Sequence, residues 1–295
     1  MILVTCAAGR VGRQIVPYLT SHGKEVRAFD ISDKVNDYVA NGQAKEAMTG
    51  DGSNAQDLDR AMKGVDQVVY IPPQFTYIED KMGKMAIDAA IRNGVKQFID
   101  LSVLVVNLDY KVHHKMKENV ERHLMYRGYE HPEMKWTVLR PAAYHHNIFL
   151  KQFYDLGLFP NYAPIDKKMS WLDARDEADV ILKVLDNPEE FNHGSFDLCN
   201  QTVSAVEVAQ MMSDATGKEI KALYCDEELQ HKYWPSYFHG GDSYSREAFN
   251  RIRESYEKWG WDGCNWTLRH LLDHEPRTIE DYLKEEAEKL GIKAN

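Results

Sequence analysis

The stretch that decides the fold is ILVTCAAGRVG, residues 2–12. Its apolar start, Ile2–Thr5, is typical of a buried strand, and the small residues after it are typical of a tight turn. The following segment places apolar residues at the spacing of one helical face, at Val11, Ile15, Val16 and Leu19. The sequence therefore predicts a strand, a turn and a helix at the start of the chain.

Strand-like and helix-like segments alternate over the first two thirds of the chain. The predicted strands are Val26–Asp30, Glu46–Thr49, Gln67–Ile71, Gln97–Ser102 and Trp136–Leu139. Predicted helices cover residues 79–93 and 111–126. Strands separated by helices pair in parallel through right-handed crossovers, so the predicted fold class is α/β with a doubly wound parallel sheet.

The chain has 295 residues, enough for one large α/β unit and a smaller region. We expect a Rossmann domain over residues 1–150 and a smaller, mixed α/β substrate region over residues 151–295. In the second part we expect strands at 169–172 and 195–198 and helices at 203–216 and 278–290. The last helix has Thr278 as its N-cap.

Composition excludes several classes of protein. The net charge is -10 and there is no long basic run, so we expect no nucleic-acid partner. No apolar run approaches the roughly 18 residues of a membrane span, and we expect no signal peptide. The four cysteines show no zinc-like spacing, so we expect reduced thiols in a cytoplasmic protein. The expected assembly is a monomer or a homodimer.

The turn after the first strand has the spacing of a dinucleotide-binding loop. The pattern G-x-x-G-x-x-G is met at Gly9 and Gly12, with Cys6 in the first place. A helix starting at Gly9 would direct N–H groups and its positive dipole end at a phosphate. We therefore predict that this loop binds NAD or NADP; a simple strand-to-helix turn is the alternative. Cys6 has a Cβ, so a positive φ there would be costly.

Asp30, at the end of the second predicted strand, lies where an acidic residue contacts the adenosine ribose. A carboxylate there accepts hydrogen bonds from the ribose hydroxyls and repels a 2′-phosphate. Arg10 in the loop would act in the opposite direction. We therefore expect NAD rather than NADP, and the alternative for Asp30 is a turn residue at a strand end.

Taken together, these and further motifs resemble the NmrA-like family of atypical short-chain dehydrogenases/reductases. The resemblance covers nearly the whole chain, and further marks are Gly50-Asp51, Asn93–Lys96, Lys117 with Glu121, Trp136–Pro141, Ser170–Asp173 and Glu275–Asp281. The resemblance implies NAD(P) binding. It also implies a list of cofactor contacts: Ala7, Ala8, Gly9, Arg10, Val11, Gly12, Asp30, Asp51, Pro72, Pro73, Ser102, Lys117, Pro141, Ala142 and Tyr144.

The catalytic pattern Tyr-x-x-x-Lys is missing. Tyr110 has His114 four residues later, whereas His113 and Lys117 keep the spacing that places two side chains on one helical face. We expect Lys117 to hold the nicotinamide ribose, with an i,i+4 pair to Glu121 as the alternative. Candidate proton donors are His113, Tyr110 and water. For His113 the alternative is a position that faces solvent. Ser102 is a candidate donor to a substrate carbonyl, and its alternative role is a cap at the end of the strand.

Side chains after the sixth strand are the candidates for the substrate side. They are Tyr144, His145 and Asn147. Adjacent histidines point apart, so we expect no metal site at His113-His114 or His145-His146. The aromatic stretch Tyr233-Trp234, Tyr237-Phe238, Trp259 and Trp261 is predicted to form a core, whose walls can also line a pocket for a flat ligand.

These features favour an NAD(P)-dependent oxidoreductase. Its expected substrate is a carbonyl or conjugated enone of a small molecule, aromatic molecules included. The missing tyrosine favours a different class, a regulatory protein that binds the dinucleotide and a protein partner without turnover.

Overall fold

The computed structural model describes residues 1–233 and 243–292 of the chain, which forms two compact units. Unit 1 takes residues 1–107, 113–140 and 177–196, and unit 2 takes residues 108–112, 141–176 and 197–295. The chain thus passes between the units several times. A single division after residue 150 stays a prediction.

Unit 1 is built on a seven-stranded sheet with the strand order β10-β6-β5-β4-β1-β2-β3. The strands are β1 (Ile2–Val4), β2 (Val26–Asp30), β3 (Glu46–Thr49), β4 (Gln67–Tyr70), β5 (Gln97–Leu101), β6 (Lys135–Pro141) and β10 (Gly194–Leu198). Every neighbouring pair from β6 to β3 is parallel. The order reverses at β1, which confirms the predicted doubly wound sheet.

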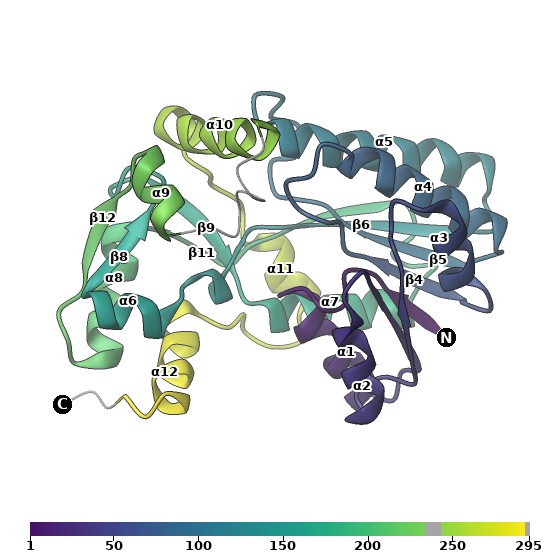
Figure 1. Ribbon diagram of the computed structural model, residues 1–295, viewed down its shortest axis with the longest axis horizontal. Helices are drawn as coiled ribbons and strands as arrows, with labels where there is room; N and C mark the ends of the chain where they lie inside the picture. The colour runs from purple at the N-terminus through teal and green to yellow at the C-terminus, as the bar shows by residue number, and fades with distance from the viewer. Residues whose placement is uncertain (234–242, 293–295) are drawn as a thin grey trace. The chain divides into compact units, whose positions relative to one another are not determined.

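Helices cover both faces of this sheet. They are α1 (Gly12–Ser21), α2 (Asn36–Ala40), α3 (Ala55–Met62), α4 (Glu79–Arg92), α5 (Val112–Glu130) and α7 (Ala174–Asp186). Figure 1 shows α4 and α5 along one face and α1 and α7 along the other. The core under α3, α4 and α5 includes Phe98, Leu124 and Trp136. The short 3-10 helix η1 (Asp33–Val35) precedes α2.

Most predicted elements of unit 1 are confirmed within one to four residues at each end. β2 and β3 have the predicted bounds, and α4 ends one residue earlier than expected. The larger difference is in the first helix, which begins at Gly12 and not at Gly9. The cause is a turn in which the Gly9 N–H donates to the Cys6 carbonyl at 3.0 Å.

A glycine lets α4 and α5 pack closely. A Cβ at Gly83 would lie 2.5 Å from a Cγ of Val120, a distance that real Cβ atoms do not adopt. Gly83 lies one turn after the start of α4, and Val120 lies one turn after Lys117 on α5. The close packing therefore brings the start of α4 next to the segment of α5 that contains Lys117.

Unit 2 contains smaller sheets and helices. Its elements are β7 (Ala143–Tyr144), η2 (His145–Asn147), α6 (Leu150–Leu156), β8 (Leu158–Asn161), β9 (Lys168–Leu172), β11 (Gln201–Ser204), α8 (Ala205–Thr216), β12 (Lys221–Tyr224), α9 (Glu227–Tyr233), α10 (Ser243–Trp259), α11 (Trp266–Leu271) and α12 (Ile279–Lys289). One sheet has the order β11-β9-β7, and β12 pairs with β8. Thr278 caps α12 with Asp281 in a reciprocal capping box, as the sequence predicts.

All four cysteines, Cys6, Cys199, Cys225 and Cys264, are free thiols, in agreement with the sequence prediction. Within residues 1–233 and 243–292, no helix has the length and apolar character needed to cross a membrane.

The predicted aromatic core of the second region is present in part. Tyr256 stacks between Tyr162 and Trp261, at ring distances of 5.6 and 5.5 Å. Trp259 is 55% exposed. Trp234, Tyr237 and Phe238 lie outside the described residues.

A lysine is buried against these rings. Lys111 is 0% exposed, and its Nζ lies 4.3 Å from the centre of the Tyr256 ring and 5.1 Å from that of Trp261. No hydrogen-bond acceptor among the described residues contacts this Nζ. Burial lowers the pKa of Lys111 to about 7, because an unpaired ammonium is poorly solvated there.

Substituting Lys111→Met should therefore stabilise the protein. The unfolded lysine has a pKa of about 10.4, so between pH 7 and pH 10 the unfolded chain binds more protons than the folded one. The lysine thus costs most stability below pH 7, and the cost falls as pH rises. We expect the variant to gain on the order of a few kcal/mol at pH 6 and little at pH 10, measured by urea unfolding. Lys258→Met, at an exposed lysine of unit 2, is the control; a loss of stability at pH 6 in Lys111→Met would contradict the analysis.

The backbone at Cys6 adopts the conformation that the sequence marked as costly. Its φ is 45°, in the left-handed region that favours glycine. The strain is local, because it comes from the Cβ of Cys6 and its own carbonyl.

An alanine variant is usually more stable than a glycine variant at the same position, and at Cys6 we expect this order of stability to reverse. Cys6→Gly should be more stable than Cys6→Ala by about 1 kcal/mol, since only glycine is unstrained at this φ. At Cys199, which has no positive φ, the alanine variant should be the more stable by roughly 0.5–1 kcal/mol. Thermal unfolding of the four variants tests this, and the same order at both positions would contradict it.

Candidate functional site

The candidate site lies at the carboxyl ends of β1, β2, β3 and β4, where a loop connects β1 to α1. A Cβ at Gly12 would lie 2.5 Å from the Ala7 carbonyl oxygen and 2.6 Å from that of Cys6. Backbone cannot yield as a flexible side chain can, so only glycine allows the helix to start this close to the loop. Glycine at this place of a dinucleotide-binding loop allows close packing of the helix on the strand.

Side chains hold the loop from the outside. The Tyr38 hydroxyl donates to the Ala7 carbonyl at 2.8 Å, and the Arg13 Nε donates to the Ala8 carbonyl at 2.8 Å. Arg10 and Val11 complete the loop before the helix, with Arg10 exposed. The loop therefore has its shape before any ligand binds.

Asp30 connects the end of β2 to this loop. Its Oδ2 accepts from the Ala8 N–H at 3.0 Å, and its Oδ1 accepts from the Ser32 N–H at 2.9 Å. Each carboxylate oxygen has a second lone pair, so both can still accept from a ligand hydroxyl. Asp30 therefore has the contacts of a strand-end turn residue, and its carboxylate can still accept from a ligand.

A cavity of about 280 Å³ lies beside Asp30. Its walls are Thr5, Cys6, Phe29, Asp30, Ile31, Gly50, Asp51, Gly52, Ser53, Leu58, Tyr70, Ile71, Pro73, Thr76, Ile78 and Met82. Two are carboxylates, and no lysine or arginine is among these described residues. Of the predicted cofactor contacts, Asp30, Asp51 and Pro73 line the cavity, whereas Pro72 and Arg10 are not among its walls.

The Cys6 thiol in this wall is not activated. Burial raises the pKa of Cys6 to about 12, and the negative charge of Asp30 acts in the same direction. The thiol is therefore neutral at physiological pH, and a neutral thiol is a poor nucleophile.

Five buried or half-buried charged residues, which we call the buried charge cluster, lie between β5, β6, α4 and α5. They are Glu79, Asp100, Lys117, Glu121 and Arg140. The Lys117 Nζ donates to Glu79 Oε1 at 2.6 Å, and Arg140 donates to both oxygens of Glu121 at 3.0 and 2.6 Å. The alternative of an i,i+4 pair between Lys117 and Glu121 is therefore wrong, because each has a different partner.

Asp100 reduces the negative charge of the buried charge cluster. Burial raises the pKa of Asp100 to about 8, and the nearby Glu121 raises it further against the effects of Lys117 and Arg140. Protonation of Asp100 therefore removes one negative charge from the buried charge cluster at neutral pH. Next to it on β4, burial raises the pKa of Tyr70 well above its usual value.

The candidate proton donors are divided between the units. Ser102 and His113 belong to unit 1, and Tyr110 belongs to unit 2. Ser102 is buried, and its Oγ contacts no hydrogen-bond partner among the described residues. His113 is half-buried, with its ring 5.3 Å from that of Phe75. The Tyr110 hydroxyl donates to Glu254.

The candidate substrate residues lie in unit 2, after β6. Pro141 and Ala142 are buried, and the Tyr144 ring stacks on that of His146 at 4.9 Å. His145 is 1% exposed, with its Nδ1 3.5 Å from Asp173 Oδ2. Asn147 ends η2. In unit 2 itself, His145 is therefore a buried residue and Tyr144 a half-buried one.

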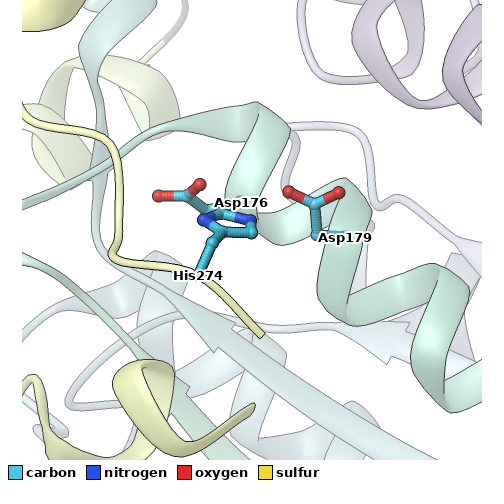
Figure 2. A group of neighbouring side chains, drawn as sticks. All are labelled: Asp176, Asp179 and His274. Carbon is cyan, nitrogen blue, oxygen red and sulfur yellow. The ribbon is translucent and has the colours of Figure 1, made fainter. Parts of the chain in front are cut away.

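Figure 2 shows Asp176 and Asp179 on successive turns of α7, with His274 beside Asp176. Asp176 is fully buried, accepts from the Arg277 N–H at 2.8 Å and pairs with the Arg277 guanidinium. Asp179 accepts from the Tyr18 hydroxyl. Both carboxylates thus have protein partners, and this group gives no reason to assign a metal.

Sequence reasoning missed several residues of the site. Tyr70, Ile71 and Thr76 line the cavity, and Glu79 and Asp100 belong to the buried charge cluster. One signal was available, because Asp100 interrupts the apolar run Phe98–Leu101. A single charge in a buried strand indicates a partner or a raised pKa.

Known proteins resemble this chain in sequence and in fold. An NAD(P)H azoreductase of Xenophilus azovorans is 27% identical over 228 residues, covering 75% of this chain and 76% of that protein. The NADP(H) complex of the Citrobacter sp. triphenylmethane reductase has a TM-score of 0.80 at 18% identity, covering 97% of this chain and 100% of that one.

A regulator has the same fold. The structure of NmrA, a negative transcriptional regulator, in complex with NAD has a TM-score of 0.78 at 19% identity, covering 99% of this chain and 98% of that one. The model of the NmrA-like family matches residues 1–290. The chain therefore belongs to the NmrA-like family.

Proposed function

We propose that the protein is an NAD(P)-dependent reductase that acts on a carbonyl or conjugated enone of a small molecule, aromatic molecules included. The observation that carries the proposal is the cavity beside Asp30, next to a loop that Gly12 holds against the start of α1. A dinucleotide needs both parts, a tight loop for the pyrophosphate and an acceptor for the ribose. The azoreductase relative supports a reductase in particular.

The residues of unit 1 fit such a ligand. The N–H groups at the start of α1 would contact the pyrophosphate, since those of Ala7, Ala8 and Gly9 already donate within the protein. Asp30 would accept from the adenosine ribose, and Asp51 with Pro73 would line the adenine side of the cavity. Lys117 would donate to the nicotinamide ribose, and the Ser102 Oγ, buried without a protein partner, would donate nearby. When bound, the dinucleotide supplies a hydride from the nicotinamide C4.

The protein itself must position the acceptor and supply a proton. We infer that His113 is the proton donor, because it keeps the spacing to Lys117 and histidine is the side chain that most often acts as a general acid. Tyr110 is the less suitable candidate, since its hydroxyl already donates to Glu254. On the substrate side we keep Tyr144, His145 and Asn147 as candidates; Tyr144 and Asn147 are half-buried within unit 2, and His145 is buried.

We further infer that NADH is preferred to NADPH. The cavity has the carboxylates of Asp30 and Asp51 in its wall and no basic side chain among the described residues that line it. A 2′-phosphate in this cavity would meet two carboxylates, with no cation among the described residues of the wall to compensate for them.

Substituting Asp30→Asn should reduce this preference. The amide can accept through one oxygen only and carries no charge, so we expect NADH affinity to fall by roughly 10-fold to 100-fold. NADPH affinity should change little or rise, because the repulsion is gone. Calorimetric titration of both nucleotides measures this, with Asp33→Asn, at an exposed acid nearby, as the control. Tighter binding of NADPH to the unsubstituted protein would overturn the inferred preference.

A turnover assay separates a reductase from a regulator. The protein should oxidise NADH, followed at 340 nm, with at least one member of a panel of quinones, enones and azo dyes. His113→Phe should lower kcat by about 10²-fold or more without weakening NADH binding, since a general acid contributes 10²–10⁴-fold. His123→Phe, on the same helix, is the control.

The second candidate function is a dinucleotide-binding regulator without turnover. The engaged Tyr110 hydroxyl and the missing Tyr-x-x-x-Lys pattern favour it, and NmrA supports it by fold. NADH binding with no oxidation across the whole panel would decide for the regulator. Turnover that survives in His113→Phe would instead reject His113 as the proton donor.

A further inference from the structure

The ion pair between Glu79 and Lys117 is unusual for its burial. The side chains are 1% and 7% exposed, and they come from different helices, α4 and α5. Glu79 is the first residue of α4, where the positive end of the helix dipole favours a carboxylate. Removing two charges from water costs several kcal/mol each, and apolar residues of similar size are often the more stable choice. Stability alone therefore does not account for this pair.

The pair is also incomplete. Glu79 Oε2 is buried and contacts no hydrogen-bond partner among the described residues. On the other side, a lysine ammonium has three N–H donors, and Glu79 accepts from one of them. A buried polar atom without a partner is rare in folded proteins and commonly marks a functional position.

The ammonium lies close enough to the cavity to act on its wall. The positive charge of Lys117 opposes the rise in the pKa of Cys6, and Cys6 lines the cavity. Asp100 also faces Lys117, but burial keeps Asp100 protonated near neutral pH. Glu121 is engaged by Arg140. Glu79 is thus the carboxylate in direct contact with the ammonium; burial raises the pKa of Glu79, and Lys117 opposes that rise.

We propose that Glu79 is a positioning residue, which holds the Lys117 ammonium in place for the hydroxyls of the nicotinamide ribose. The inference rests on the proposed function, because it requires Lys117 to bind that ribose. Glu79 fixes one N–H of the ammonium and leaves the others for the ligand. Because the close packing at Gly83 and Val120 sets the distance between α4 and α5, the ammonium is placed before the nucleotide arrives.

Three nucleotides distinguish positioning from a merely structural role. NADH and ADP-ribose contain the second ribose, whereas ADP lacks it. In Glu79→Gln we expect NADH and ADP-ribose to bind at least 10-fold more weakly, and ADP to bind within about 2-fold of the unsubstituted protein. Calorimetric titration of the full chain measures all three. An equal loss for the three nucleotides would overturn the inference, since it would indicate general damage to the fold.

The other ion pair of the buried charge cluster provides the matched control. Glu121→Gln breaks a buried pair on the same helix as Lys117 and should lower the melting temperature in a similar way. It should change the affinities for NADH and ADP by the same small factor. A selective loss of NADH binding in Glu121→Gln would show that any broken charge pair has this effect, and would overturn the inference.

Two further variants separate this inference from the function on which it rests. If Lys117→Met loses affinity for NADH and for ADP by the same factor, Lys117 does not contact the nicotinamide ribose, and its proposed role is wrong. If Lys117→Met is selective and Glu79→Gln is not, only the positioning role fails. In the double variant the two effects should not add, because Glu79 acts through Lys117.

If Glu79→Gln folds poorly, Glu79→Asp provides a second test of the same inference. Glu79→Asp keeps the charge and shortens the side chain by one methylene group, so the ammonium moves without losing its counter-ion. We expect a smaller loss of NADH and ADP-ribose affinity than in Glu79→Gln, again with ADP unchanged. Affinity for all three nucleotides equal to that of the unsubstituted protein would overturn the inference.

Discussion

The structure depends on one steric constraint, the absence of a side chain at Gly12. Backbone atoms of Cys6 and Ala7 occupy the space that a Cβ would need, so α1 starts directly against the loop after β1. Asp30 then fixes that loop to the end of β2 through the Ala8 N–H. Because β1, β2, β3 and β4 end at the same edge of the sheet, the cavity is a consequence of this contact and of the parallel order.

Burying charged side chains beneath α4 and α5 costs folding free energy, and two features of the fold reduce this cost. Lys117 and Arg140 each have a carboxylate partner, and Asp100 avoids a third negative charge by holding its proton. The remaining cost in free energy comes from buried polar atoms that have no partner in the described part of the chain, at Glu79, Asp100, Ser102 and Tyr70. A protein selected for stability alone would replace such groups by apolar ones. Their concentration on one face of the sheet, beside the cavity, is typical of a binding site.

The same fold serves both reductases and a regulator, so the family does not decide the chemistry. What decides it is whether a proton donor and an acceptor site accompany the dinucleotide. The chain departs from the common catalytic pattern at this point, with His113 where a tyrosine would stand and with Tyr110 bound to Glu254. Cys6 is a second departure, in which a strained backbone is kept although glycine would relieve it.

The sequence by itself determined the alternation of strands and helices, the glycine at position 12, the acid at position 30 and the cap at Thr278. These are local, because periodicity, turn chemistry and capping act over a few residues. Only the tertiary structure decided that Lys117 pairs with Glu79 and not with Glu121, that Lys111 is buried against aromatic rings, and that α1 starts at Gly12. Lys117 and Glu79 are 38 positions apart in the sequence, and they meet because α4 and α5 pack closely. A local sequence pattern covers only a few residues and cannot predict such a pair.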